Sequence, residues 1–272
     1  MDISFGYAPS PFGRLHYAEQ GTGRPLLLLH QTPRSWDEFR ELLPLLAPHR
    51  RAIAMDMLGF GASAKPPAPH TIELFAAGAL ALLDVLGIER ADVMGHHTGG
   101  AVAIELAASA PERVGLLVLS SAPWTGPRYR ESHADGPGVD EAVRDPGGDH
   151  LLTLWRKRLP YYPEPATELL DRFVHDALAP GVDPAEGHRA CARYRMEDRI
   201  GLVKAPVLLL GAAADPFAMP AMAPLREHLT GAASVRSAVI DGGTIPLMEH
   251  KAGEVAEAVL GFLGPAAVGG QD

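Results

Sequence analysis

A five-residue turn with a glycine at each end, Gly95-His96-His97-Thr98-Gly99, constrains the fold of this chain more than any other stretch. An apolar run, residues 91–94, precedes the turn, and a stretch rich in Ala, Ile, Leu and Val, residues 101–110, follows it. The first is typical of a short buried strand and the second of a helix. The sequence therefore predicts a strand, a tight turn and a helix in direct succession.

The same alternation continues along most of the chain. Apolar runs at residues 25–30, 114–120 and 205–211, and the more mixed residues 50–55 and 235–240, predict further strands. Residues 3–19 predict a hairpin at the sheet edge. Ser35 and Glu38 form a capping box, which predicts a helix that ends near Ala47. Thr71 is expected to cap another helix that ends near Leu86. Strands that alternate with helices predict an α/β fold with a mostly parallel, eight-stranded sheet covered on both faces.

One region departs from this alternation. Residues 125–204 contain many prolines and charges, several helical patterns and no clear apolar strand. Together with Trp124, which directly precedes them, they hold seven of the 17 aromatic residues of the chain. This composition is typical of a lid above an apolar pocket. We therefore expect a core made of residues 1–124 and 205–272, with residues 125–204 inserted in it as a helical lid.

Charge and composition narrow the range of partners. The net charge of −9 argues against a general nucleic-acid binder. The single cysteine, Cys191, excludes an internal disulfide and a thiolate metal cluster. The sequence shows neither the features of a signal peptide nor an apolar run that could span a bilayer. We expect a cytoplasmic monomer or homodimer that acts on a small molecule without membrane, nucleic acid, metal or cofactor.

The candidate site residues share one position in the predicted topology, because each follows a predicted strand. In a parallel sheet, ligands bind beyond the carboxyl ends of the strands. Side chains at these ends should therefore gather along one rim. The residues in question are His30, Asp56, His97, Ser121, Asp215 and Gly242.

Several motifs resemble those of the α/β-hydrolase fold family, and together they extend along nearly the whole chain. His30-Gln31-Thr32-Pro33 resembles the oxyanion loop H-G-x-P, and residues 56–63 resemble the segment D-x-x-G-x-G-x-S. Gly95 to Gly99 resembles the nucleophile elbow G-x-S-x-G. Asp215 lies where the family carries its acid, and residues 241–249 resemble the loop that carries its histidine. The resemblance implies the α/β-hydrolase fold.

Three positions differ from the family pattern. His97 occupies the position of the nucleophilic serine, Thr244 that of the catalytic histidine, and Gln31 that of a glycine. An acyl-enzyme on serine is therefore excluded. Imidazole is larger than a hydroxymethyl group, and threonine is smaller than histidine. We therefore expect His97 to extend beside Thr244 so that Asp215 binds one ring nitrogen while the other faces the pocket.

The remaining site predictions concern the surroundings of His97. The backbone N–H groups of Thr32 and Thr98 are the expected oxyanion donors, the second because it begins a helix. Gln31 either donates an amide hydrogen bond to the substrate or replaces the glycine without consequence. His96 is expected on the oxyanion or lid side, with Trp124 as a further substrate contact. We expect His30 to brace the oxyanion loop, and Glu249 and His250 to cap the last helix or to face solvent.

Three functions remain compatible with these residues. The leading one is cofactor-independent acid–base chemistry by His97 on a small apolar or aromatic carbonyl compound. It would be non-hydrolytic (cyclisation, isomerisation, elimination or C–C bond chemistry), by analogy with relatives that act in natural-product biosynthesis. The alternatives are hydrolysis of an ester, lactone or epoxide by water that His97 activates, and a catalytically inactive ligand-binding protein.

Overall fold

A computed structural model describes residues 2–133 and 139–264 of the chain. Its central feature is one eight-stranded sheet in the order β1-β2-β4-β3-β5-β6-β7-β8. The pairs β1·β2 and β2·β4 are antiparallel, and all other neighbours are parallel. The strands are β1 (Ser4–Ser10), β2 (Gly13–Gln20), β3 (Pro25–Leu29), β4 (Arg51–Met55), β5 (Ala91–His96), β6 (Val114–Ser120), β7 (Val207–Ala212) and β8 (Val235–Ile240). The predicted hairpin and mostly parallel sheet are confirmed.

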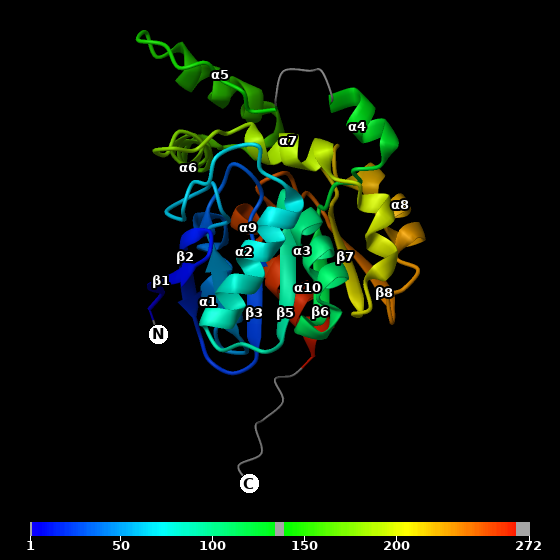
Figure 1. Ribbon diagram of the computed structural model, residues 1–272. Helices are drawn as coiled ribbons and strands as arrows, with labels where there is room; N and C mark the ends of the chain where they lie inside the picture. Colours follow the sequence, from blue (N-terminus) through cyan, green and yellow to red (C-terminus); the bar gives the residue numbers. More distant parts are fainter. Residues whose placement is uncertain (1, 134–138, 265–272) are drawn as a thin grey trace.

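Helices cover both faces of this sheet (Figure 1). On one face lie α2 (Ile72–Val85), α3 (Thr98–Ser109) and α8 (Met222–His228), and on the other lie α1 (Leu43–Leu46), α9 (Leu247–His250) and α10 (Ala252–Leu263). Strand β3 shows how the sequence produces two cores. Leu27 and Leu29 pack into the first and Leu26 and Leu28 into the second, because successive side chains of a strand point to opposite faces.

The predicted helix from Ser35 to Ala47 is wrong in its length. The structure has a short 3-10 helix, η1 (Trp36–Phe39), followed by α1 (Leu43–Leu46). Ser35 does cap the first helix, because its hydroxyl accepts from the N–H of Asp37. Pro44 stands in the first turn of α1, where a missing N–H is tolerated, but its ring cannot continue a preceding helix. The proline therefore divides the helix in two.

The inserted segment, residues 125–204, lies between β6 and β7 and covers the carboxyl ends of the parallel strands (Figure 1). Its longer helices are α4 (Pro127–His133), α5 (Asp149–Arg158), α6 (Thr167–Ala177) and α7 (Glu186–Arg193). Residues 134–138 of this segment and 265–272 of the expected core lie outside the described residues. Among the described helices none combines the length and the apolar character that crossing a membrane requires.

Candidate active site

A cavity of about 760 Å³ lies between the inserted segment and the carboxyl ends of the strands. Five of the eight predicted site residues line it, namely Gln31, Thr32, His97, Thr98 and Trp124. The cavity wall is largely aromatic and apolar elsewhere. The predicted rim of the sheet and the inserted segment therefore enclose one site.

His97 stands on a strained turn at the floor of this cavity. Its φ of 45° is a left-handed conformation that few residues other than glycine adopt. The two flanking positions must be glycine because a side chain at either one would clash with the backbone. A Cβ on Gly95 would lie 2.1 Å from the carbonyl oxygen of Gly99, and one on Gly99 would lie 2.0 Å from that of Leu29. The turn therefore forces the side chain at position 97 out of the sheet and into the cavity.

His97 and Asp215 are in close polar contact, with His97 Nε2 2.8 Å from Asp215 Oδ2. The atoms are close, although their alignment is not that of a full hydrogen bond. The other carboxylate oxygen, Oδ1, accepts from the N–H groups of Phe217 (2.9 Å) and Ala218 (3.1 Å). Burial alone would raise the pKa of Asp215, but the His97 ring and these N–H groups lower it to about 2. Asp215 is therefore an ionised acid that holds one edge of the His97 ring.

The second ring nitrogen of His97, Nδ1, has no hydrogen bond to a residue within 2–133 or 139–264. The ring lines the cavity and its side chain is 17% exposed. An imidazole held at one nitrogen and open at the other is suited to accept or donate a proton.

Thr244 lies outside the cavity lining. Its hydroxyl is 3.4 Å from Nε2 of His250, so its nearest described polar contact is with the helix that follows. The structure thus gives no support to direct contact between Thr244 and a substrate. It does agree with the argument from volume, because the His97 ring reaches Asp215 where a histidine at 244 would otherwise compete for the same acid.

The two predicted oxyanion donors, Thr32 and Thr98, lie side by side. Their hydroxyl oxygens are 2.9 Å apart, and Thr98 is the first residue of α3, where backbone N–H groups lack partners within the helix. The Gln31 carbonyl accepts from His30 Nδ1 (2.6 Å) and from the N–H of Arg34 (3.0 Å). In a trans peptide the N–H points opposite to the C=O, so these bonds orient the N–H of Thr32.

His30 has a bracing contact at each ring nitrogen. Nδ1 donates to the Gln31 carbonyl, which leaves Nε2 to accept from the N–H of Met57 at 3.0 Å. Burial lowers the pKa of His30, so the ring is neutral. These contacts support the bracing role expected of His30.

Gln31 is turned towards the protein interior rather than offering its amide to the cavity. Its side-chain Nε2 donates to Glu38 Oε1 (2.8 Å) and its backbone N–H donates to Glu38 Oε2 (2.7 Å). Burial raises the pKa of Glu38 to about 8 despite the nearby charge of Arg34. The amide nitrogen is therefore bound to Glu38, which speaks against the first of the two alternatives for Gln31, an amide hydrogen bond to the substrate.

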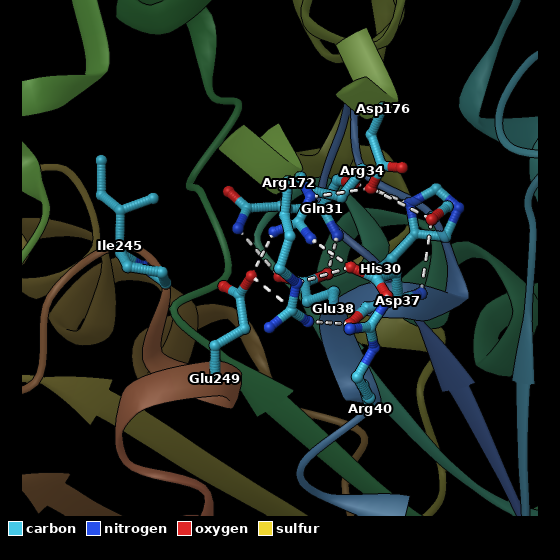
Figure 2. Close-up of polar contacts among 12 residues, drawn as sticks. His30, Gln31, Arg34, Asp37, Glu38, Arg40, Arg172, Asp176, Ile245 and Glu249 are labelled. Carbon is cyan, nitrogen blue, oxygen red and sulfur yellow. Dashed lines mark hydrogen bonds and ion pairs between the residues drawn. The ribbon is translucent and has the colours of Figure 1, made fainter. Parts of the chain in front are cut away.

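Glu38 belongs to a buried cluster of charged side chains beneath the oxyanion loop (Figure 2). At its centre Arg34, fully buried, contacts Glu249 Oε1 at 2.5 Å and Asp176 Oδ2 at 2.9 Å. Arg172 adds a bond to Asp37 Oδ2 at 2.7 Å. The expectation that Glu249 caps a helix or faces solvent is wrong, because it is a buried partner of a guanidinium. The sequence around Glu249, at the end of the loop of residues 241–249, does not indicate that its side chain is buried against Arg34.

His96 does not face the cavity, which corrects the prediction of a substrate contact. It is fully buried, and its Nε2 donates to the Ile245 carbonyl at 3.1 Å. Its Nδ1 is left to accept from the Ser120 hydroxyl at 3.2 Å. Burial, together with the adjacent His97 ring, lowers the pKa of His96 to about 3. The residue is therefore a neutral support behind the elbow.

Helix α7 of the inserted segment contacts the oxyanion loop directly, which the sequence did not predict. A Cβ on Gly187 would lie 2.1 Å from the hydroxyl oxygen of Thr32. Cys191, one turn later, lines the cavity beside Thr98. Burial raises the pKa of its thiol to about 12, so it remains protonated.

The charged or titratable residues of the inserted segment that line the cavity include Asp140, Arg158 and His188. The sequence analysis missed them because no motif links them and they are far apart in the chain. Within the described part of the chain, no group of three His, Cys, Asp or Glu side chains is arranged to hold a metal ion.

Comparison with known proteins bears on the fold and on the chemistry separately. The model of the family described as alpha/beta hydrolase fold matches residues 24–250. Solved structures that are similar to this chain over at least 95% of its length include two hydrolytic enzymes. They are an epoxide hydrolase from an endophytic Streptomyces (TM-score 0.78, 24% identity, 95% of that chain) and the enol-lactonase from Burkholderia xenovorans LB400 (TM-score 0.76, 23% identity, 99% of that chain). At these identities they show the fold alone.

Curated relatives match over shorter stretches. The 2-hydroxymuconate semialdehyde hydrolase of Pseudomonas sp. (strain CF600) is 41% identical over 110 residues, which is 39% of each chain. Bifunctional epoxide hydrolase 2 of Mus musculus is 37% identical over 130 residues, 46% of this chain and 24% of the relative. The matched stretches thus span well under half the length of these relatives.

Proposed function

This chain belongs to the α/β-hydrolase fold family, and from that premise we propose that it is a hydrolase in which His97 activates water. The substrate class is an ester or lactone, with an epoxide as the second choice. The observation that carries the proposal is the contact between His97 Nε2 and Asp215 at 2.8 Å, combined with a His97 ring that opens on the cavity. It provides a positioned base where the family pattern has a serine.

The mechanism follows from the position of these groups. His97 Nδ1 removes a proton from water as the water oxygen bonds to the carbonyl carbon. Asp215 stabilises the imidazolium that forms. The carbonyl oxygen becomes an oxyanion, to which the N–H groups of Thr32 and Thr98 donate. The tetrahedral intermediate then collapses, and the bond to the leaving oxygen breaks with its electron pair on that oxygen. The leaving oxygen takes up a proton and departs as the alcohol, and the acid is released. No acyl-enzyme forms, because position 97 has no hydroxyl.

The relatives favour hydrolysis over the non-hydrolytic chemistry that the sequence alone suggested. The curated matches include a semialdehyde hydrolase and epoxide hydrolases. Their names describe reactions in which water is a substrate. The same base and oxyanion donors would serve such a reaction, so we place hydrolysis first.

The cavity wall indicates the body of the substrate. Aromatic side chains from the core and from the inserted segment face the same space, among them Trp124, Tyr129, Tyr161 and Phe217. A cavity of about 760 Å³ accommodates a small molecule rather than a polymer. We therefore propose an apolar or aromatic acyl compound, and a lid function for the inserted segment.

The test combines one variant with isotopic labelling. Aryl and alkyl esters and lactones of phenylalkanoic acids are incubated in ¹⁸O-water with the wild type, with His97→Ala and with His49→Ala, an exposed histidine away from the cavity. We expect ¹⁸O in the product acid of the wild type. We expect kcat to fall roughly 10²- to 10⁴-fold in His97→Ala and to stay unchanged in His49→Ala.

Other results would separate the alternatives. Undiminished turnover in His97→Ala removes the proposal. Conversion of a ketone without label in the product would indicate the non-hydrolytic function, and tight binding without any conversion would indicate a ligand-binding protein.

A further inference from the structure

A second pair of an aspartate and a histidine, besides Asp215 and His97, stands at the cavity. His188 Nε2 lies 3.1 Å from Asp140 Oδ2, and both residues line the cavity. The first pair stands on the sheet rim and the second on the inserted segment that covers it. One cavity is thus bordered by two imidazoles, each of which is held by its own carboxylate.

Asp140 is a firmly held anion. It is only 1% exposed, its Oδ1 accepts from Arg158 Nε at 2.7 Å, and a second Arg158 nitrogen contacts Oδ2. Burial would raise the pKa of Asp140, but Arg158 and the hydrogen bond from His188 lower it to about 2. Arg158 is itself fixed, with its guanidinium carbon 5.0 Å from the centre of the Phe173 ring. The carboxylate can therefore orient His188 without moving.

His188 keeps one ring nitrogen available. Asp140 accounts for Nε2, whereas Nδ1 has no hydrogen bond to any residue that the structure describes. The side chain is 21% exposed, so it is neither buried among apolar groups nor free in solvent. A ring in this state can release a proton from Nδ1 when it is charged.

Helix α7 places His188 next to the oxyanion donors. The preceding residue, Gly187, packs on the hydroxyl of Thr32, and helix α7 contacts helix α3, whose first residue is Thr98. His188 lines the same cavity as Thr32 and Thr98. The helix that carries the second imidazole therefore packs on the loop and on the helix that are expected to supply the N–H groups.

We propose that His188 is the general acid that protonates the leaving oxygen. This inference rests on the proposed hydrolysis by His97. When the tetrahedral intermediate collapses, the carbon–oxygen bond to the leaving group breaks and its electron pair passes to the leaving oxygen. That oxygen takes the proton from His188 Nδ1, which leaves His188 neutral. His97 then loses to solvent the proton that it took from water, and His188 regains one from solvent, so that ester and water give acid and alcohol.

Two proton-transfer groups suit this site because His97, held by Asp215, is not free to move from the attacking water to the leaving oxygen. In a serine hydrolase one histidine serves both nucleophile and leaving group from its own loop. Here the ring stands on the elbow itself and is held by Asp215. His188, on helix α7 of the inserted segment, supplies a separate donor to the same cavity. An assisted departure matters only when the leaving group is basic, and this dependence supplies the test.

The experiment compares two esters that share one phenylalkanoyl part. A 4-nitrophenyl ester has a leaving group that departs without a proton, whereas an ethyl ester has one that needs it. In His188→Gln we expect kcat/KM for the ethyl ester to fall on the order of 10²-fold and that for the 4-nitrophenyl ester to change by about twofold or less. His188→Asn should show the same pattern. His150→Gln, which breaks an Asp–His contact of 3.3 Å with Asp145 outside the cavity lining, should leave both activities unchanged.

The ratio of the two activities decides the question. Both esters are assayed on one preparation, so an incompletely folded variant lowers both equally and leaves the ratio unaltered. An unchanged ratio in both His188 variants overturns the role of His188 as the general acid. This holds even if His97→Ala abolishes both activities, in which case the proposed hydrolysis itself stands. A wild-type activity that His97→Ala does not reduce would instead overturn the proposed function.

Discussion

Two adjacent histidines have opposite environments in this protein. Both nitrogens of His96 are bound inside the core, by the Ser120 hydroxyl and the Ile245 carbonyl. His97, one residue later, projects from a left-handed turn and keeps one nitrogen open to the cavity. Consecutive residues at the end of a strand point to opposite sides, so one supports the elbow and the other is available for chemistry.

The neutral state of His96 makes stability depend on pH. Its pKa is about 3 in the folded protein and near 6.5 in the unfolded chain. Below pH 6.5 the unfolded chain therefore binds more protons, and the free energy of unfolding falls as the pH falls. Between pH 7.5 and 5 we expect the wild type to lose about 2 kcal/mol more than His96→Gln, measured by urea unfolding.

The measurement needs a control variant, and it must allow for Glu38, whose effect on stability has the opposite pH dependence. His49→Gln, at an exposed position, should follow the wild type at every pH. Glu38 acts in the opposite sense. Its raised pKa of about 8 means that the folded protein binds the extra proton between about pH 4.5 and 8, so Glu38 adds stability as the pH falls. Both wild type and variant contain Glu38, whose Oε1 lies 3.6 Å from His96 Nε2, so their difference reports His96 together with its contact to Glu38. Parallel pH curves for the two proteins would contradict the prediction.

At the scale of elements, the helices of the inserted segment differ in how they attach to the core. Helix α6 is tied by Asp176 to the buried Arg34, and by Arg172 to Asp37 (Figure 2). Helix α7 is tied by Glu186, which accepts from the N–H of His70 at 2.7 Å. Helix α5 in contrast exposes about half of the Leu152 side chain, so it is the less anchored part of the cover.

The anchor of α6 can be tested by removing one charge. Asp176→Asn leaves Arg34 with one fewer anion in a fully buried position, and we expect a loss of about 3 kcal/mol in the free energy of unfolding. Asp171→Asn, an exposed position on the same helix, should change it by less than about 0.5 kcal/mol. Urea unfolding measures both values. Hydrogen exchange should show faster exchange of α6 amides in Asp176→Asn alone, and equal stabilities of the two variants would show that α6 is held by apolar packing instead.

At the scale of the whole molecule, the sequence predicted what local patterns and short motifs encode. The leucines of β3 and the glycines of the elbow constrain their own neighbourhoods, and the motif spacing placed His97 and Asp215 on one rim. The helix after Ser35 is shorter than predicted because Ser35 caps only the first short helix, and Pro44 stands in the first turn of a separate one. Asp140 and His188 were missed because their contact joins residues 48 positions apart in a segment without motifs.

The distribution of charge leads to a last prediction. The chain carries a net charge of −9, yet the described residues that line the cavity include three cations, Arg128, Lys157 and Arg158, and one anion, Asp140. Arg158 and Asp140 neutralise each other. Arg128 has no hydrogen bond or ion pair with a residue in the described ranges. An available cation at the edge of an apolar cavity should favour substrates that carry a carboxylate.

We therefore expect the wild type to bind a phenylalkanoate more tightly than the corresponding carboxamide, measured by calorimetry. Arg128→Gln should reduce this preference roughly fivefold, a modest effect because the side chain is exposed and screened by solvent. Added salt should weaken the preference in the wild type but not in the variant. Arg236→Gln removes the same charge from an exposed position on β8 outside the cavity lining and should retain the preference. Equal reductions in the two variants would mean that net charge, rather than contact with Arg128, selects the anion.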